Sequence, residues 1–307
     1  MIVEVAVAAA FAVVAGVNDG GALLATGHKL PTVRPALGLA ALVAANALVP
    51  LLTHEVAGTF VRRLAGPADP GTTTVAVIAA LAVVLTLTHH GRPTSLTLAV
   101  VGALAGAALG RGTPVDPGAL ALVLAVGLAA PFAGALAAPA VSRLLTLVTT
   151  GRGLRHWHWA GFGLQCLAYA ANDGQKMLAV FTLALGVQGA PPAVTLPAAV
   201  LFGAGALYGM PRAGRTLARE IIASRPLHNV AAELGSGVTV VGCAAAGMPV
   251  SMTQSVAGGL IGTGLAGGGG RVRWHAAVRI ALAWLLTLPA SAAVAGAATF
   301  ALTAAAP

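Results

Sequence analysis

Charged residues are scarce in this 307-residue sequence, where only 8% of positions are Asp, Glu, Lys or Arg. A soluble domain usually carries about 25% charged residues, so this chain cannot cover a water-facing surface. Aromatic residues make up 4%, and the two cysteines form no CxxC pair. Cys166 and Cys243 lie in apolar stretches, which favours packing over redox or metal chemistry.

The sequence is instead rich in apolar runs, with 58% hydrophobic residues and a mean hydropathy of +0.89. These runs approach the roughly 20 residues that a helix needs to cross hydrocarbon. We therefore predict an all-α polytopic membrane protein, and leave open whether 93–110 and 248–264 cross the membrane or fold as re-entrant hairpins. About ten membrane segments are expected, at 2–27, 36–53, 74–88, 93–110, 118–139, 160–187, 193–210, 230–246, 248–264 and 274–304.

Basic residues exceed acidic ones, giving a net charge of +9. In a membrane protein such an excess marks cytoplasmic loops, so we expect a lipid bilayer and no nucleic acid as partner. We predict a multi-pass protein of the plasma (inner) membrane with both termini outside. The outside loops would then hold Arg62, Arg63 and Arg111, and the inside loops Lys29, Arg34, Arg92, Arg143, Arg152, Arg155, Arg212, Arg215, Arg219, Arg225, Arg271 and Arg273.

Two short motifs occur twice in the same order. The pair Asn18-Asp19 recurs 154 residues later as Asn172-Asp173. The stretch "RPTSLT" at 92–97 recurs 156 residues later as "MPVSMT" at 248–253. This spacing predicts two repeats, 1–150 and 151–307, within one transport unit. An odd number of segments in each half predicts opposite orientations in the membrane.

Asp19 and Asp173 are the acidic residues that lie deepest in apolar sequence. A carboxylate there costs several kcal/mol unless it meets a cation, a proton or a hydrogen-bond network. Asn-Asp-Gly favours backbone that departs from a helix. A helix interrupted in the membrane offers free carbonyls and amides to an ion. The alternative is a structural hydrogen bond between buried helices.

The second motif suits the start of a helix, because Pro fits a first turn and hydroxyl side chains follow it. Two such N-termini facing each other would bind a tetrahedral oxyanion through amides and hydroxyls. Simple helix capping is the alternative. The residues concerned are Pro93, Ser95 and Thr97 in the first copy and Pro249, Ser251 and Thr253 in the second.

Three other patterns have simpler interpretations. The pairs His89-His90 and His156-x-His158 have no neighbouring carboxylates or thiols in the sequence, so we expect no metal site there. The four residues at 267–270 are all glycine and predict a flexible loop rather than a phosphate-binding loop. Gly102-x3-Gly106 and Gly258-x3-Gly262 predict close helix packing.

Several of these stretches resemble the PiT class of inorganic phosphate transporters. The segments that carry the resemblance are "ANDGQKMLAV" at 171–180, "GMPVSMTQ" at 247–254 and the closing helix at 271–289. The resemblance spans both halves and implies inverted-topology repeats with broken helices. It also implies a secondary active transporter, not an enzyme, that imports inorganic phosphate by sodium or proton symport around a midplane site.

The resemblance also assigns roles to individual residues. Sodium is the candidate co-substrate ion, and no other cofactor is expected. Lys176 would compensate substrate charge or form a plain salt bridge. The implied coupling-ion residues are Asn18, Asp19, Asn172 and Asp173, and the implied phosphate-binding residues are Ser95, Thr97, Gln175, Ser251 and Thr253.

The sequence departs from the family pattern at four positions. Ala22 stands where Asn is usual, Leu96 and Met252 replace small hydroxyl residues, and Leu98 replaces His. Two alternatives therefore stay open, a sulfate permease on the same scaffold and a degenerate, non-transporting membrane scaffold. A homodimer is also left open. An intramembrane hydrolase is disfavoured, because the sequence shows no nucleophile–base pair.

Overall fold

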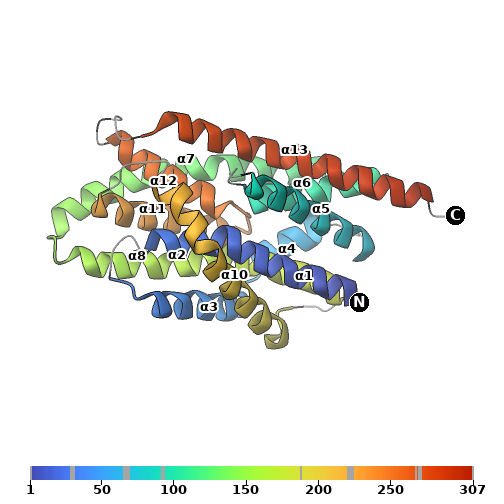
Figure 1. Cartoon of the computed structure of the whole chain (residues 1–307), viewed down its shortest axis with the longest axis horizontal. Helices are drawn as coiled ribbons and strands as arrows, with labels where there is room; N and C mark the ends of the chain where they lie inside the picture. Colours follow the sequence, from blue (N-terminus) through green and yellow to red (C-terminus); the bar gives the residue numbers. More distant parts are fainter. Residues whose placement is uncertain are drawn as a thin grey trace.

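The structure is a computed structural model that describes residues 2–27, 32–64, 70–90, 94–186, 189–219, 225–266, 268 and 272–305. Regular secondary structure in these ranges is helical (Figure 1). The first half contains α1 (Ile2–Ala15), η1 (Gly16–Gly20), α2 (Gly21–Gly27), α3 (Pro35–Leu52), α4 (Glu55–Gly58), η2 (Thr59–Leu64), α5 (Pro70–His89), α6 (Leu96–Gly110) and α7 (Pro117–Val148). The second half contains α8 (Leu154–Tyr169), η3 (Ala170–Gly174), α9 (Gln175–Leu185), α10 (Pro192–Arg219), α11 (Pro226–Ala245), α12 (Met252–Ala266) and α13 (Trp274–Ala305).

Each of the predicted apolar segments forms helix, which confirms an all-α membrane protein. Six helical stretches in the described residues are long and apolar enough to cross a bilayer. Helices α4 and η2 were missed by the sequence analysis, which treated residues 55–64 as part of a loop. The six spans are Ile2–Ala25, Pro35–Leu52, Pro70–His89, Pro117–Val148, Pro192–Pro211 and Trp274–Ala305.

Helix boundaries follow local chemistry. Helices α3, α7 and α11 each begin with a proline, whose missing N–H is no loss in a first turn. The Asp116 carboxylate caps α7 by accepting from the amides of Gly118 and Ala119 at 2.9 and 3.1 Å. Gly186 ends α9 in the left-handed conformation, at a φ of 64°.

Two helical hairpins, α5–α6 and α11–α12, enter the molecule from opposite ends and meet in its interior (Figure 1). Thr94 and Ser95 at the tip of the first hairpin and Val250 and Ser251 at the tip of the second are buried. The Thr97 hydroxyl on the first hairpin donates to the Val250 carbonyl on the second at 3.0 Å. This arrangement favours re-entrant hairpins over simple spans for 93–110 and 248–264.

Each hairpin packs against the last helix of the opposite half, α6 on α13 and α12 on α7. The contacts are close because glycines face backbone carbonyls across each interface. A Cβ added at Gly106 would lie 2.1 Å from the Ala292 oxygen, and one added at Gly262 would lie 2.0 Å from the Ala135 oxygen. The predicted close packing is confirmed, and the partners show that the two halves are interlocked.

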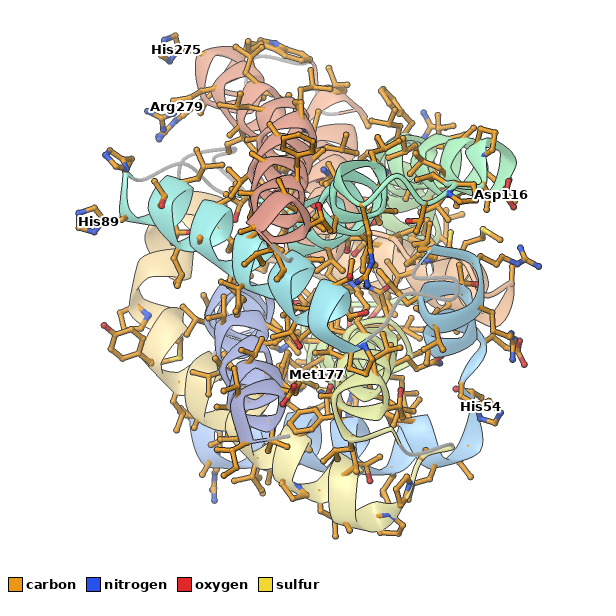
Figure 2. The ribbon with its side chains drawn as sticks, turned by 90° about the vertical axis from the view of Figure 1, so that its right-hand side faces the viewer. His54, His89, Asp116, Met177, His275 and Arg279 are labelled. Atoms are coloured by element: carbon orange, nitrogen blue, oxygen red, sulfur yellow. The ribbon has the colours of Figure 1, made fainter. Side chains whose placement is uncertain are left out.

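Both termini lie at one end of the molecule, at the right of Figure 1. The α7–α8 connection and the N-terminal end of α13 lie toward the other end (Figure 1). Figure 2 looks at the molecule from the side of the termini. Met177 lies in the interior of the bundle, whereas His54, His89 and Asp116 lie at its periphery.

A methyl group added at the hairpin glycines is expected to destabilise the protein. Gly106→Ala and Gly262→Ala would force the backbones apart, at a typical overpacking cost of about 1–3 kcal/mol. We expect a lower midpoint of thermal unfolding in detergent for both variants. Gly127→Ala is the control, because a Cβ there meets nothing within 4 Å. Equal midpoints for Gly106→Ala and Gly127→Ala would contradict the packing argument.

Candidate functional site

The two Asn-Asp pairs lie on π-helical turns, η1 and η3, in the middle of otherwise α-helical stretches. Asp19, Asn172 and Asp173 are buried. In both halves the Asn side-chain amide donates to the next carboxylate at 3.1 Å. The predicted departure from α-helix therefore occurs at both places. The helix widens into a π turn, a common feature of functional sites, rather than breaking, so the backbone remains helical throughout.

The hairpin tips lie beside these π turns. The Asn172 side chain pairs with the Val250 backbone twice, donating to its carbonyl at 2.7 Å and accepting from its amide at 3.1 Å. In the first half the Thr94 hydroxyl donates to the Asn18 side-chain oxygen at 3.5 Å. Each Asn thus contacts the tip of the hairpin in its own half. The two repeated motifs, far apart in sequence, form one buried polar centre.

Pro249 of the second motif does not begin a helix. Residues 248–251 are not helical, and α12 starts at Met252, three residues after Pro249. The expectation of Pro249 in a first turn is therefore wrong, because the chain is still non-helical at the tip and the helix begins only at Met252. Ser95 occupies the cap position of α6, where its Oγ accepts from the Leu98 amide at 3.2 Å. Pro93 lies outside the described residues.

Lys176 lies at the middle of this polar centre. Its ammonium is 2.6 Å from Asp173 Oδ1 and donates to the Thr97 hydroxyl at 2.7 Å and to the Val250 carbonyl at 3.3 Å. Both charged side chains are no more than 3% exposed. Asp19 is near enough to interact electrostatically with Asp173 and Lys176. The ammonium therefore pairs directly with Asp173, and Asp19 adds a second buried carboxylate to the polar centre.

The remaining hydroxyl residues lie at the second tip. Ser251 and Thr253 are buried, and their hydroxyl oxygens are 3.2 Å apart. They stand at the start of α12, whose first amides have no helical carbonyl to bond. Together with Ser95 and Thr97 at the start of α6, they provide donors from two helix N-termini. An oxyanion binds well to such a set of groups.

Gln175 is buried but is engaged elsewhere. Its side-chain oxygen accepts from the amides of Val56 and Ala57 at 2.8 and 3.3 Å, and its nitrogen donates to the Thr53 hydroxyl at 3.0 Å. These contacts cap α4, the short helix that the sequence analysis missed. Thr59 extends the attachment, because its hydroxyl donates to the Gly247 carbonyl at 2.6 Å. The α4–η2 segment is therefore held by hydrogen bonds to the start of α9 and to the tip of the α11–α12 hairpin.

A further buried polar cluster was missed by the sequence analysis. Glu233 on α11 is 3% exposed, so it is as buried as Asp19. His158 on α8 lies 3.7 Å from its carboxylate, and Gln165 donates to the Glu233 carbonyl at 2.6 Å and to the Ser236 hydroxyl at 2.8 Å. The signal was present, since Glu233 stands alone in the apolar stretch 230–246.

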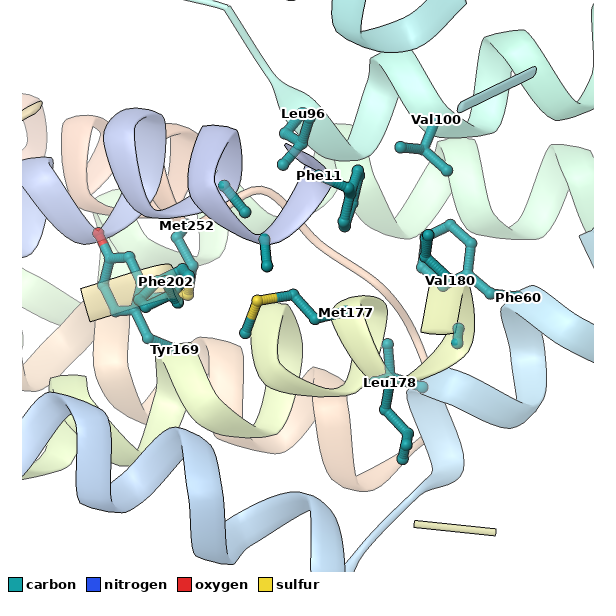
Figure 3. Packing of buried hydrophobic residues seen from close by; sticks show 14 of the residues in the cluster. Phe11, Phe60, Leu96, Val100, Tyr169, Met177, Leu178, Val180, Phe202 and Met252 are labelled. Carbon is teal, nitrogen blue, oxygen red and sulfur yellow. The ribbon is translucent and has the colours of Figure 1, made fainter. Parts of the chain in front are cut away.

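The positions that depart from the family pattern are hydrophobic packing sites. Leu96 and Met252 belong to the main buried cluster, which also holds Tyr169, Met177 and Phe202 (Figure 3). Leu98 lines an apolar cavity of about 480 Å³ between α6, α7, α12 and α13. These side chains are therefore part of the apolar packing that surrounds the polar centre.

Known phosphate transporters are similar to this chain in sequence. Residues 153–295 match the phosphate transporter family. A "Probable low-affinity inorganic phosphate transporter" of Mycobacterium bovis is 30% identical, with 98% of this chain and 77% of the relative covered. A Bacillus subtilis protein described in the same words is 26% identical, with 95% and 94% covered.

A solved structure shares the fold. "The sodium-dependent phosphate transporter" superposes with a TM-score of 0.84, covering 99% of each chain at 17% sequence identity. The sequence match at 30% identity extends over nearly the whole of this chain and includes both Asn-Asp turns and both hairpins. The chain belongs to the phosphate transporter family.

Proposed function

We propose that this protein is a secondary active transporter that imports inorganic phosphate by symport with a cation. The observation that carries the proposal is the buried polar centre, where two Asn-Asp turns meet the N-terminal ends of α6 and α12. An apolar bundle tolerates such a centre only if its polar groups have partners. Phosphate and a cation together are ligands that suit a centre with hydroxyls, amides and carboxylates.

Phosphate would bind between the two hairpin tips. Ser95, Thr97, Ser251 and Thr253 would donate from their hydroxyls, and the helix N-termini would add amide donors and positive dipole ends. Lys176 would compensate part of the negative charge. Gln175, which the sequence also assigns to phosphate, would have to leave its contacts on α4 to reach the substrate. Its binding role therefore requires α4 to move during transport.

The coupling ion would offset the charge of the substrate. Asn18, Asp19, Asn172 and Asp173 are the proposed coupling-ion residues, with sodium or a proton as the co-substrate. Moving one uncompensated charge against 100 mV costs about 2.3 kcal/mol. A phosphate anion entering a negative-inside cell meets this cost, and a cation travelling with it cancels it.

Alternating access would use two inverted repeats, 1–150 and 151–307. Matching elements support this division, because η1 and η3 each have 5 residues, α6 and α12 each 15, and α7 and α13 each 32. Each hairpin contacts the last helix of the other half, so a movement of one half is transmitted to the other. The two halves would rock around the midplane site.

Uptake of labelled phosphate tests the transport proposal. In proteoliposomes with an imposed sodium or proton gradient, we expect uptake of labelled phosphate, reduced at least about tenfold in Asp19→Asn and Asp173→Asn because the buried carboxylates are lost. Asp116→Asn is the matched control, since this exposed residue caps α7 and Asn caps equally well.

The same assay separates the alternatives. Uptake that resists excess sulfate supports phosphate as the substrate. Labelled sulfate uptake would assign a sulfate permease instead. Absence of uptake of either anion by folded protein would overturn the transport proposal and favour a non-transporting scaffold. The gradient that drives uptake identifies the coupling ion.

We propose that the protein lies in the plasma membrane with both termini outside. Arg152 and Arg155 lie at the α7–α8 connection and Asp116 at the α6–α7 connection, toward opposite ends of the molecule. The positive-inside rule places the arginines in the cytoplasm. In intact cells, a membrane-impermeant thiol reagent should label Asp116→Cys and spare Arg152→Cys. The reverse pattern would invert the topology.

A further inference from the structure

The Lys176 ammonium occupies a position that resembles a cation-binding site. Its three oxygen neighbours are a carboxylate oxygen of Asp173, the Thr97 hydroxyl and the Val250 carbonyl, at 2.6, 2.7 and 3.3 Å. Carboxylate, hydroxyl and carbonyl oxygens are the ligands of hard cations, and transporters bind sodium with carbonyls near interrupted helices. A lysine ammonium is a compact point charge with three donors, so it can replace such an ion.

This position is fixed from both halves of the chain. Thr97 comes from the first hairpin, whereas Val250 and Asp173 come from the second half, and the Asn172 amide anchors both of these. Lys176 and its oxygen neighbours are buried, with 3% of the lysine side chain exposed. The ammonium is therefore held within the polar centre rather than extended toward water.

Each of these oxygen-bearing residues has an equivalent in the repeat, but Lys176 does not. Asp19 corresponds to Asp173, and the residue that corresponds to Lys176 at the same offset of 154 is Ala22. At the offset of 156, Thr253 corresponds to Thr97 and Thr94 to Val250. Asp19 is buried, at 3% exposed. An ion bound directly to Asp19 must therefore come from solution, because Ala22 carries no charge.

We propose that Lys176 is a tethered cation that fills the coupling-ion site of the second half, so that the exchangeable cation binds only in the first half, at Asp19. This inference rests on the proposed function and narrows it. The tethered charge neutralises Asp173 without crossing the membrane. Each phosphate would then be transported with one cation fewer than in a protein whose two coupling-ion sites are both open.

The test is sodium-dependent thermal stability in detergent without phosphate, comparing 1 and 150 mM sodium chloride with choline chloride keeping ionic strength constant. Lys176→Ala recreates the first-half residue and opens the second site. We expect its unfolding midpoint to gain about 2–4 °C more from sodium than that of the wild type, because a ligand stabilises the state that binds it. Adding Asp173→Asn to this variant should abolish the gain.

The corresponding substitution in the first half, Ala22→Lys, is an independent test. It places a tethered cation beside Asp19 and should remove the sodium response of the wild type. An unchanged sodium response in Lys176→Ala would overturn the proposal. If Lys176→Ala does not fold, Ala22→Lys decides, and a retained response overturns the proposal.

Transport kinetics provide a second measurement. We expect the Hill slope for sodium in phosphate uptake to rise from about 1 in the wild type to about 2 in Lys176→Ala, since each open site adds one ion. Equal slopes would contradict the proposal. Absence of wild-type uptake would overturn the proposed function alone, because the stability measurement needs no transport.

Discussion

Non-helical backbone in an apolar interior must find hydrogen-bond partners within the protein. In this molecule the non-helical tip before α12 meets that requirement through Asn172, which bonds both the amide and the carbonyl of Val250. The same carbonyl accepts from Thr97 and Lys176. The hairpin tips, the second π turn and the buried charges are thus connected through the backbone of one residue, Val250.

The glycine interfaces explain how this polar centre is held in place. Gly106 and Gly262 bring each hairpin against the last helix of the opposite half. Without side chains at these positions the backbones approach closely, which is the main way that helices associate in lipid. The centre is therefore enclosed by contacts that cross between the halves, and a displacement of one half must alter its shape.

The halves are alike in architecture and different in charge. Asp19 and Asp173 occupy equivalent π turns and have the same Asn neighbour and the same 3.1 Å hydrogen bond. Lys176 breaks the equivalence, since Ala22 stands at the matching place. Near symmetry suits the proposed rocking movement of two halves, while Lys176 would give the two proposed ion positions different roles.

The sequence by itself determined the helical membrane class, the repeated motifs and the buried character of Asp19 and Asp173, because hydropathy and residue spacing act locally along the chain. Only the tertiary structure decided which groups meet. It brought Lys176 to Thr97, 79 residues away, used Gln175 to cap α4, and placed Glu233 beside His158. Such contacts depend on how helices pack across the molecule, and local sequence does not encode a side chain's distant partner.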